Sequence, residues 1–410
     1  MLLDRGHWRV SFGAMASPLA GDWVQVPSRA FEIEISNLEL IAACWGPDVA
    51  EHVAHRIATR LKTAGLHVAR DVASRQFRIL GDAGTDRPVC WDRLADLSYR
   101  LTAEPVCIET ITGEAGAGVH AVMTWQNDEP PRYRGPRDVR RDHGDGWFAL
   151  YRNDMRAVAQ AFRCAGEGRM AAHWQPVRHY AEPGRILYHE GLVRFDDPDA
   201  TLSPATIFPA LERTGTATTF DWVMVRHVLD ALKAETDAVL GVNISANSAH
   251  LNGWWRGVLD TLSERPDLAA RLVVEITETE AIAHIHDAVA FAQALRATGA
   301  TLALDDFGAG FTSIRQLMDL VPALVKVDGL FLQRAVRDCE PCHSLPHLVG
   351  LIRELGGTVI VEGVETQTMA DLAYVSGAVW QQGYHHGRPS AARRGTEQVE
   401  PVARIVAGKG

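Results

Sequence analysis

Short apolar runs alternate with helix-length segments through the second half of the chain. Each run spans three to five residues and is rich in aliphatic side chains, as expected of a buried strand. The runs lie at residues 186–188, 239–242, 272–274, 301–304, 323–327, 358–361 and 378–380. This alternation predicts repeated strand–helix units on a mainly parallel sheet, and a region of about 240 residues suits a closed barrel.

The first half of the chain has a different pattern. Residues 31–35 alternate like a half-buried strand, and residues 50–61 carry apolar side chains at helical spacing, which predicts a small α/β domain. Residues 130–146 are rich in Pro, Gly and Arg and read as a linker. The predicted divisions are an N-terminal extension (1–28), the small domain (29–126), the linker (127–147), the barrel (148–392) and a C-terminal tail (393–410).

Composition narrows the class of protein. The 410 residues are enough for two or three domains, and a net charge of −10 gives nucleic acid no global attraction, so we expect none as a partner. We found no apolar run of membrane-spanning length and no secretory signal, and we therefore expect a cytoplasmic protein without membrane insertion. Six cysteines over this length are too sparse for a disulfide framework.

Polar side chains follow or end the apolar runs, at intervals of about one strand–helix unit. Because the carboxyl ends of barrel strands meet at one mouth, we expect these side chains to lie close together. They are Glu190, Asn243, Glu275, Asp305, Asp306, Lys326, Asp328, Glu362 and Gln382.

Several carboxylates at one mouth cannot all ionise unaided, and a divalent cation removes the conflict. Oxygen ligands without matching His or Cys favour Mg²⁺ or Mn²⁺, and this many ligands suit two ions that hydrolyse a phosphate ester. Lys326 could orient the attacking water or hold phosphate. A single acid at a strand end is usually a solvated terminus, so the residues predict a metal-dependent barrel enzyme only as a set.

At these residues the sequence resembles the EAL family of cyclic di-GMP phosphodiesterases, from about Trp147 to Pro389. The resemblance implies a TIM-like (β/α)8 barrel. Glu190-Gly191-Leu192-Val193-Arg194 stands where the family has E-A-L-L-R. The other matching segments are 174–177 (WQPV), 242–246 (VNISA), 275–278 (EITE), 305–311 (DDFGAGF), 326–328 (KVD), 362–365 (EGVE) and 382–384 (QGY).

The resemblance implies hydrolysis of cyclic di-GMP to linear pGpG with two Mg²⁺ or Mn²⁺ ions. The metal ligands by this match are Glu190, Asn243, Glu275, Asp305, Asp306 and Glu362, with Asp305 as the bridge. Lys326 matches a lysine that touches the hydrolytic water, and the catalytic set is Lys326, Glu362 and Asp306. The general base is assigned either to the second-site glutamate or to the water itself.

The same match assigns substrate-binding and loop-anchoring positions. The substrate-binding positions are Gln175, Leu192, Arg194, Asp328 and Gln382. Glu278 and Glu365 match anchors of the loop at residues 307–313, which in the family couples dimerisation to metal binding. The resemblance therefore also implies a homodimer formed through the barrel.

Two departures from the family pattern are mild. Gly191 replaces the signature Ala and widens the accessible backbone range beside Glu190, and Phe311 replaces a common Tyr. No metal ligand is missing, which favours activity. The alternative is a catalytically silent receptor that binds cyclic di-GMP and signals through protein–protein contacts; a third possibility is that pGpG or another cyclic dinucleotide is the substrate.

The first half resembles a GGDEF diguanylate cyclase domain in frame only. Residues 73–77 (ASRQF) occupy the signature position, Ser36 replaces an acid, and Ala42 and Ala43 stand where guanine-reading side chains belong. We therefore expect a degenerate GGDEF-like domain without cyclase activity and with a regulatory or dimerising role.

Three other patterns could suggest binding sites, but we do not interpret them as such. The segment 339–343 (CEPCH) matches a haem-attachment pattern but follows a barrel strand, so we interpret it as a loop. The pairs His284/His286 and His385/His386 are interpreted as surface features. Trp254 and Trp255 are expected to pack in a core or interface.

Overall fold

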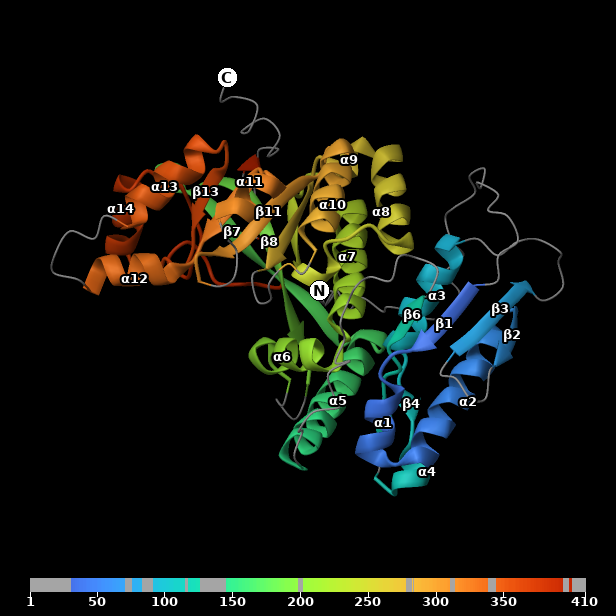
Figure 1. Ribbon diagram of the computed structural model, residues 1–410. Coiled ribbons are helices and arrows are strands. Elements are labelled where there is room, and N and C mark those ends of the chain that lie inside the picture. The colour runs from blue at the N-terminus through green and yellow to red at the C-terminus, as the bar shows by residue number, and fades with distance from the viewer. Residues whose placement is uncertain are drawn as a thin grey trace, which may run out of the picture. The chain divides into compact units, whose positions relative to one another are not determined.

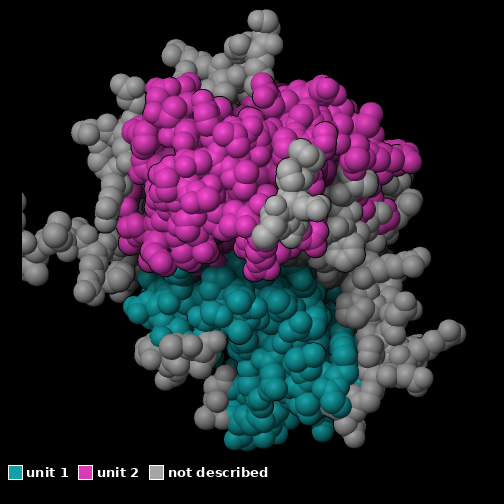
Figure 2. Space-filling view, turned by 90° about the vertical axis from the view of Figure 1, so that its left-hand side faces the viewer, with its two compact units in different colours: residues 1–171, 194–220, 252–254 teal, residues 172–193, 221–251, 255–410 magenta. Residues whose placement is uncertain are grey.

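A computed structural model describes most of the chain outside the predicted N-terminal extension. The described residues are 31–70, 76–82, 91–114, 117–125, 145–197, 202–277, 282, 284–309, 314–337, 344–393 and 398–399. They form two compact units (Figure 2). The first unit comprises the described parts of 1–171, 194–220 and 252–254, and the second those of 172–193, 221–251 and 255–410.

The first unit contains a four-stranded antiparallel sheet in the order β2-β3-β1-β6 (Figure 1). Its strands are β1 (Phe31–Ile35), β2 (Leu66–Arg70), β3 (Gln76–Asp82) and β6 (Met123–Trp125), and a separate ribbon pairs β4 (Val106–Cys107) with β5 (Gly118–Val119). Its helices are α1 (Leu38–Trp45), α2 (Pro47–Thr63), α3 (Trp91–Ala103), α4 (Glu109–Thr112), α5 (Asp145–Gly166) and α6 (Pro204–Thr214). The predicted strand at 31–35 and the predicted helix at 50–61 are both confirmed.

Helix α2 packs one apolar face into the core of the first unit. Pro47 starts it, where a missing N–H costs nothing, and Asp48 lies in the positive first turn. Val53, Ile57 and Leu61 recur every four residues and are fully buried. The apolar spacing in the sequence therefore decides which face of the helix is covered.

The second unit is built around a closed ring of eight strands. The ring runs β8-β7-β14-β13-β12-β11-β10-β9 and closes where β9 pairs with β8. This confirms the predicted TIM-like (β/α)8 barrel. Its strands are β7 (Met170–His179), β8 (Arg185–Phe195), β9 (Leu240–Ser245), β10 (Leu272–Thr277), β11 (Thr301–Phe307), β12 (Leu324–Val327), β13 (Thr358–Val361) and β14 (Trp380–Gln381), while β15 (Gln398–Val399) pairs with β8 outside the ring.

Strand β7 is the one barrel strand that the apolar runs did not predict. Polar residues interrupt it at His173, Gln175 and Arg178, and Pro176 lies in its centre. It also runs antiparallel to β14. The other neighbouring strands, in the order β8-β9-β10-β11-β12-β13-β14, pair in parallel.

Helices connect the parallel strands. They are α7 (Ala217–Ala234), the 3₁₀ turn η1 (Ala246–Ser248), α8 (Gly253–Glu264), α9 (Pro266–Ala269), α10 (Ile285–Ala297), α11 (Ile314–Leu320), α12 (Gly329–Arg337), α13 (Ser344–Glu354) and α14 (Gln367–Val375). Among the described helices, none combines the length and apolar character needed to cross a membrane.

A layer of buried side chains fills the barrel below the predicted site residues. It comprises Val177, Leu187, Tyr188, Val239, Val273, Ala303, Leu324, Ile360 and Trp380. Side chains two positions apart on a strand point to the same face. Glu275 therefore points into the barrel like Val273, and Asp305 points into it like Ala303. The apolar layer thus sets the depth at which the polar groups emerge.

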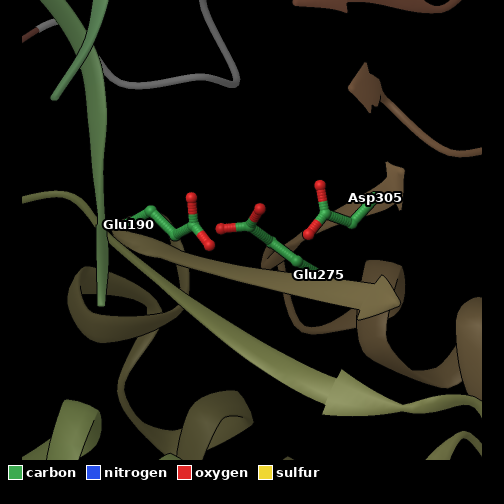
Figure 3. A group of neighbouring side chains, drawn as sticks. All are labelled: Glu190, Glu275 and Asp305. Carbon is green, nitrogen blue, oxygen red and sulfur yellow. The ribbon is translucent and has the colours of Figure 1, made fainter. Parts of the chain in front are cut away.

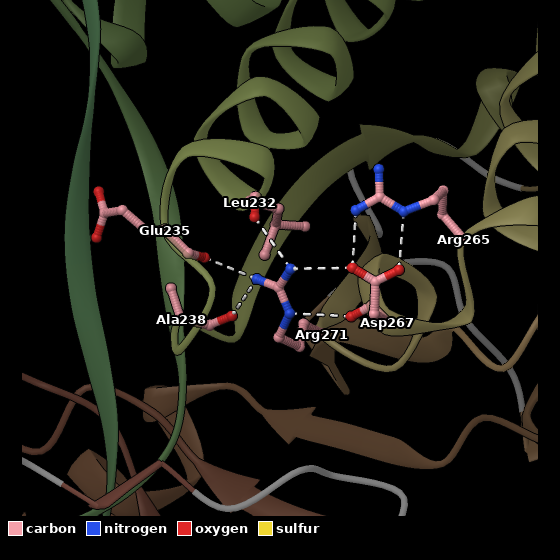
Figure 4. A network of polar contacts seen from close by, with 6 residues as sticks. All are labelled: Leu232, Glu235, Ala238, Arg265, Asp267 and Arg271. Atoms are coloured by element: carbon pink, nitrogen blue, oxygen red, sulfur yellow. Dashed lines mark hydrogen bonds and ion pairs between the residues drawn. The ribbon is translucent and has the colours of Figure 1, made fainter.

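Arg271 joins the end of α7 to the start of β10 (Figure 4). Its side chain is only 12% exposed. The guanidinium donates to four backbone carbonyls at 2.8–3.1 Å, those of Leu232, Glu235, Ala238 and Asp267. Carbonyls at the end of a helix lack helical partners, so this contact satisfies them and fixes the strand that carries Glu275.

Candidate active site

Three buried carboxylates from three barrel strands point toward one another (Figure 3). Glu190 comes from β8, Glu275 from β10 and Asp305 from β11, and one oxygen from each lies within 4.8 Å of the others. A second group of the same size contains Asp305, Asp306 and Glu362. The structure thus brings five predicted ligands into two groups that share Asp305.

A β-bulge places Asp305 and Asp306 in the same centre. Successive residues of a regular strand point to opposite faces, so the alternation alone would turn one of them away. The register between β11 and β12 shifts between Leu304 and Phe307, and Asp306 has a φ of 54°. A bulge with one residue in the left-handed region re-aims a side chain, and such backbone strain is typical of functional sites.

Lys326 lies in the middle of the carboxylates. Its Nζ is 3.1 Å from Glu190, 2.9 Å from Glu275, 2.8 Å from Asp305 and 2.9 Å from Glu362. The side chain is 1% exposed. An ammonium group has three protons, so it cannot satisfy four carboxylates at once.

Two amides hold Glu190. The Nδ2 of Asn243 donates to its Oε1 at 2.5 Å, and the Nε2 of Gln382 donates to its Oε2 at 2.5 Å. Burial by itself would raise the pKa of Glu190, but Lys326 and the two amides together lower it. Glu190 is therefore held as an anion.

The other carboxyl groups resist ionisation. Burial, opposed by Lys326, raises the pKa of Glu275 to about 8. Burial and then the neighbouring Asp305 raise the pKa of Asp306 to about 7 and that of Glu362 well above its ordinary value. The pKa of Asp305 is raised as well, chiefly by burial. Burial and neighbouring negative charge therefore favour the protonated forms of these groups, and added positive charge would oppose this.

The donor set fits divalent cations that prefer oxygen. The Oδ1 of Asn243, both carboxylate oxygens of Glu275 and the Oδ1 of Asp305 are buried and accept no aligned hydrogen bond within the described part of the chain. The five carboxylates and Lys326 have a formal charge of −4, which two divalent ions would balance. Carboxylate and amide oxygens are ligands that Mg²⁺ and Mn²⁺ favour.

Asp221 supports the site from the second turn of α7 and was missed in the sequence. Its Oδ2 accepts hydrogen bonds from the backbone N–H of Ser245 at 2.8 Å and from the hydroxyls of Ser245 and Ser248 at 2.7 Å each. These bonds fix the turn that follows Asn243. An acid inside a helix carries no sequence signal of such a contact.

Tyr188 and Gly241 lie directly below the carboxylates and were also missed. A Cβ atom on Gly241 would come within 2.3 Å of Glu275 Oε1 and 2.7 Å of Tyr188 Cε2, so only glycine fits. The Tyr188 ring is fully buried, and burial followed by the Glu275 charge raises the pKa of its hydroxyl well above the ordinary value. The two-residue strand period would have found both positions, because they precede Glu190 and Asn243 by two residues.

The remaining predicted positions occupy varied places. Gln175 is buried and donates to the carbonyl of Gly387 at 3.1 Å, and Asp328 accepts the backbone N–H of Leu330 at 2.6 Å near the start of α12. Leu192 and Arg194 are half-buried, and Arg194 belongs to the first unit. Glu365 is exposed. Glu278, Phe311 and residues 310–313 lie outside the described residues.

The patterns set aside in the sequence can be placed in part. Trp254 and Trp255 are 7% and 0% exposed, as expected of packing residues. His386 shares a hydrogen bond of 2.9 Å with the Oε1 of Gln381. The 339–343 segment is outside the described residues.

Fold and site together define a TIM-like barrel with an acidic, oxygen-rich centre at the carboxyl ends of its strands. Residues 155–389 match the EAL domain, and the chain belongs to this family.

Two curated relatives and one solved structure illustrate the similarity. Cyclic di-GMP phosphodiesterase PdeL of Escherichia coli is 30% identical over 237 residues, which are 56% of this chain and 65% of the relative. Cyclic di-GMP phosphodiesterase PdeF of the same organism is 28% identical over 370 residues, 87% of this chain and 47% of the relative. The structure "PaMucR Phosphodiesterase, c-di-GMP complex" aligns with a TM-score of 0.50 at 25% identity, over 57% of this chain and 97% of that one. The chain thus spans less than two thirds of both curated relatives.

Proposed function

We propose that this chain hydrolyses one phosphodiester bond of cyclic di-GMP and releases linear pGpG. The observation that carries the proposal is the pair of carboxylate groups sharing Asp305 around Lys326. The family match and the phosphodiesterase names of the two E. coli relatives support the substrate.

Two Mg²⁺ or Mn²⁺ ions complete the site in this proposal. Glu190, Asn243, Glu275 and Asp305 hold the first, and Asp305, Asp306 and Glu362 hold the second. When bound, such ions supply an activated water and neutralise charge on the reacting phosphate.

The protein's own groups position the reactants. Lys326 directs its ammonium into the centre, where it orients the attacking water or a phosphate oxygen. Glu362 and Asp306 lie together with Asp305 in the second carboxylate group, where a carboxylate can accept a proton from the attacking water. In this proposal Glu362 accepts the proton of the attacking water. The second possibility is that this water is already deprotonated and needs no base from the protein.

We assign the substrate contacts to the positions that match substrate-binding residues of the EAL family. Gln382 and Gln175 offer amides, Arg194 offers a guanidinium suited to phosphate, and Leu192 and Asp328 complete the set. Glu278 and Glu365 remain the proposed anchors of the loop at 307–313.

The first half of the chain is proposed as a degenerate GGDEF-like regulator without cyclase activity. The match to PdeF, which extends over 87% of this chain, supports a two-part arrangement. The predicted domain divisions, a homodimer through the barrel and a cytoplasmic location belong to the same proposal.

The proposal is tested by incubating the protein with cyclic di-GMP in Mg²⁺, Mn²⁺ or EDTA and separating the products by chromatography. Metal-dependent formation of pGpG from cyclic di-GMP supports the proposed hydrolysis. In separate reactions, pGpG or another cyclic dinucleotide replaces cyclic di-GMP, to test whether either is the preferred substrate. Calorimetric binding of cyclic di-GMP without turnover in either metal would replace the enzyme with a silent receptor.

A further inference from the structure

A pocket lies at the end of the barrel opposite the carboxylate centre. Its volume is about 270 Å³, below the range of pockets for drug-sized ligands. Arg185, Thr358 and Trp380 line it, and each is the first residue of its strand. Glu362 follows the other end of the strand that starts at Thr358, about 13 Å away at about 3.3 Å per residue.

Two arginines bring positive charge to the lining of this pocket. Arg185 contributes from β8 and Arg353 from the last turn of α13, and His179 adds its imidazole from the end of β7. The Nδ1 of His179 is buried and has no hydrogen-bond partner within the described residues. Among the described residues, none that lines the pocket carries a negative charge.

One carboxylate, that of Glu182, lies beside Arg185 and His179. Glu182, whose side chain is 63% exposed, places its Oε1 3.5 Å from Arg185 Nη1 and 3.9 Å from His179 Nδ1. Both distances are longer than a strong charged hydrogen bond. Glu182 therefore marks an anion position that it occupies only loosely.

The aromatic residue of the pocket is not free to stack a base. The Arg185 guanidinium carbon lies 5.4 Å from the centre of the Trp380 ring. The His179 ring meets the same indole edge-to-face at 5.1 Å and 83°. Trp380 is 3% exposed and packs against the Arg185 guanidinium and the His179 imidazole instead.

We infer that this pocket binds the phosphate group of a small ligand, either free phosphate or a phosphate monoester. The guanidiniums of Arg185 and Arg353 and the imidazole of His179 offer several N–H donors to the oxygens of a phosphate. The volume of the pocket fits a small anion. The bound phosphate displaces the Glu182 carboxylate. The inference stands independently of cyclic di-GMP hydrolysis, because the two sites share no residue.

Calorimetric titration of the full chain in EDTA with inorganic phosphate, GMP and guanosine tests this site. Without divalent ions the carboxylate centre offers phosphate only the ammonium of Lys326, which four carboxyl groups already surround. We expect phosphate and GMP to bind and guanosine not to bind; binding of phosphate alone would identify the free anion as the ligand.

Three variants separate the pocket from general surface charge. Arg353→Gln weakens phosphate binding by about tenfold or more, since a charged hydrogen-bond donor is lost. Arg334→Gln is the matched control, because Arg334 is an exposed arginine near the end of α12, and it leaves binding unchanged. Glu182→Gln removes the competing carboxylate and tightens binding about threefold. Absence of phosphate binding, equal effects of the Arg353 and Arg334 variants, or weaker binding in Glu182→Gln would each overturn the inference.

Discussion

The Cζ3 atom of Trp174 lies 3.1 Å from the position that a Cβ atom on Gly191 would occupy. The carbonyl oxygen of Gly241 lies 3.0 Å from the same position. Trp174 is 8% exposed, and Gly191 directly follows the proposed ligand Glu190. Where the EAL signature has Ala, this chain therefore has a glycine against which a neighbouring indole packs.

This packing predicts that Gly191→Ala is harmful in this chain. The new methyl must displace the indole or the Gly241 carbonyl, so we expect a loss of about 1–3 kcal/mol in the free energy of unfolding and reduced turnover. Combining it with Trp174→Phe removes the larger ring and restores part of both. Urea unfolding and kcat/KM of the two single variants and the double variant measure the coupling. Additive effects would show that the two residues do not pack against each other as described.

Lys326→Met tests the central ammonium. It keeps a long side chain but leaves four carboxylates without their shared counter-ion, so kcat falls more than KM rises. In EDTA we expect a lower free energy of unfolding by about 3–5 kcal/mol, as for other broken buried ion pairs. Lys233→Met is the control, since Lys233 is exposed and its ion pair within the described residues is with Asp230 one turn away. A change in KM alone would contradict a role of Lys326 at the reacting atoms.

The raised carboxyl pKa values predict an unusual pH dependence of stability in EDTA. Glu275 has a pKa of about 8 and Asp306 of about 7 in the folded protein, both through burial first, so the folded state binds more protons than the unfolded state. Stability therefore falls as pH rises from about 6.5 to 8.5. Mg²⁺ reduces the fall, because it binds the ionised carboxylates. Melting temperatures across this range check the sign, and Asp306→Asn flattens the curve; a rise of stability with pH in EDTA would refute the assignment.

Arg271 predicts a stability effect distant from the chemistry. Arg271→Gln leaves carbonyls at the end of α7 without a buried donor, and we expect a loss of about 1–3 kcal/mol in the free energy of unfolding. Arg265→Gln is the matched control, because in the described part of the chain the Arg265 guanidinium binds the exposed Asp267, and the substitution leaves stability nearly unchanged. Equal urea midpoints for both variants would remove the capping role.

Much of the barrel was predictable because buried parallel strands are apolar throughout. The seven runs lie in or overlap seven barrel strands, and β7 escaped because His173, Gln175 and Arg178 break its apolar pattern. The approach of Glu190, Glu275 and Asp305 followed from the rule that strand ends converge.

The finer arrangement of the site could not be predicted from spacing. Asp306 reaches the centre through a bulge, and the register shift that creates it is a property of two paired strands rather than of one sequence. Asp221 acts across a distance of 24 residues, on Ser245, through hydrogen bonds that no local pattern announces. The roles assigned to Glu278 and Glu365 stay predictions.

The central claim is that two carboxylate groups sharing Asp305 hold two divalent cations that hydrolysis requires. Equilibrium dialysis of Mn²⁺, with turnover of cyclic di-GMP followed on the same samples, tests it most directly. We predict two ions per chain in the wild type, and in Asp305→Asn fewer than two ions and no turnover. Two bound ions and near-normal turnover in Asp305→Asn, or full turnover of the wild type in EDTA, would contradict it.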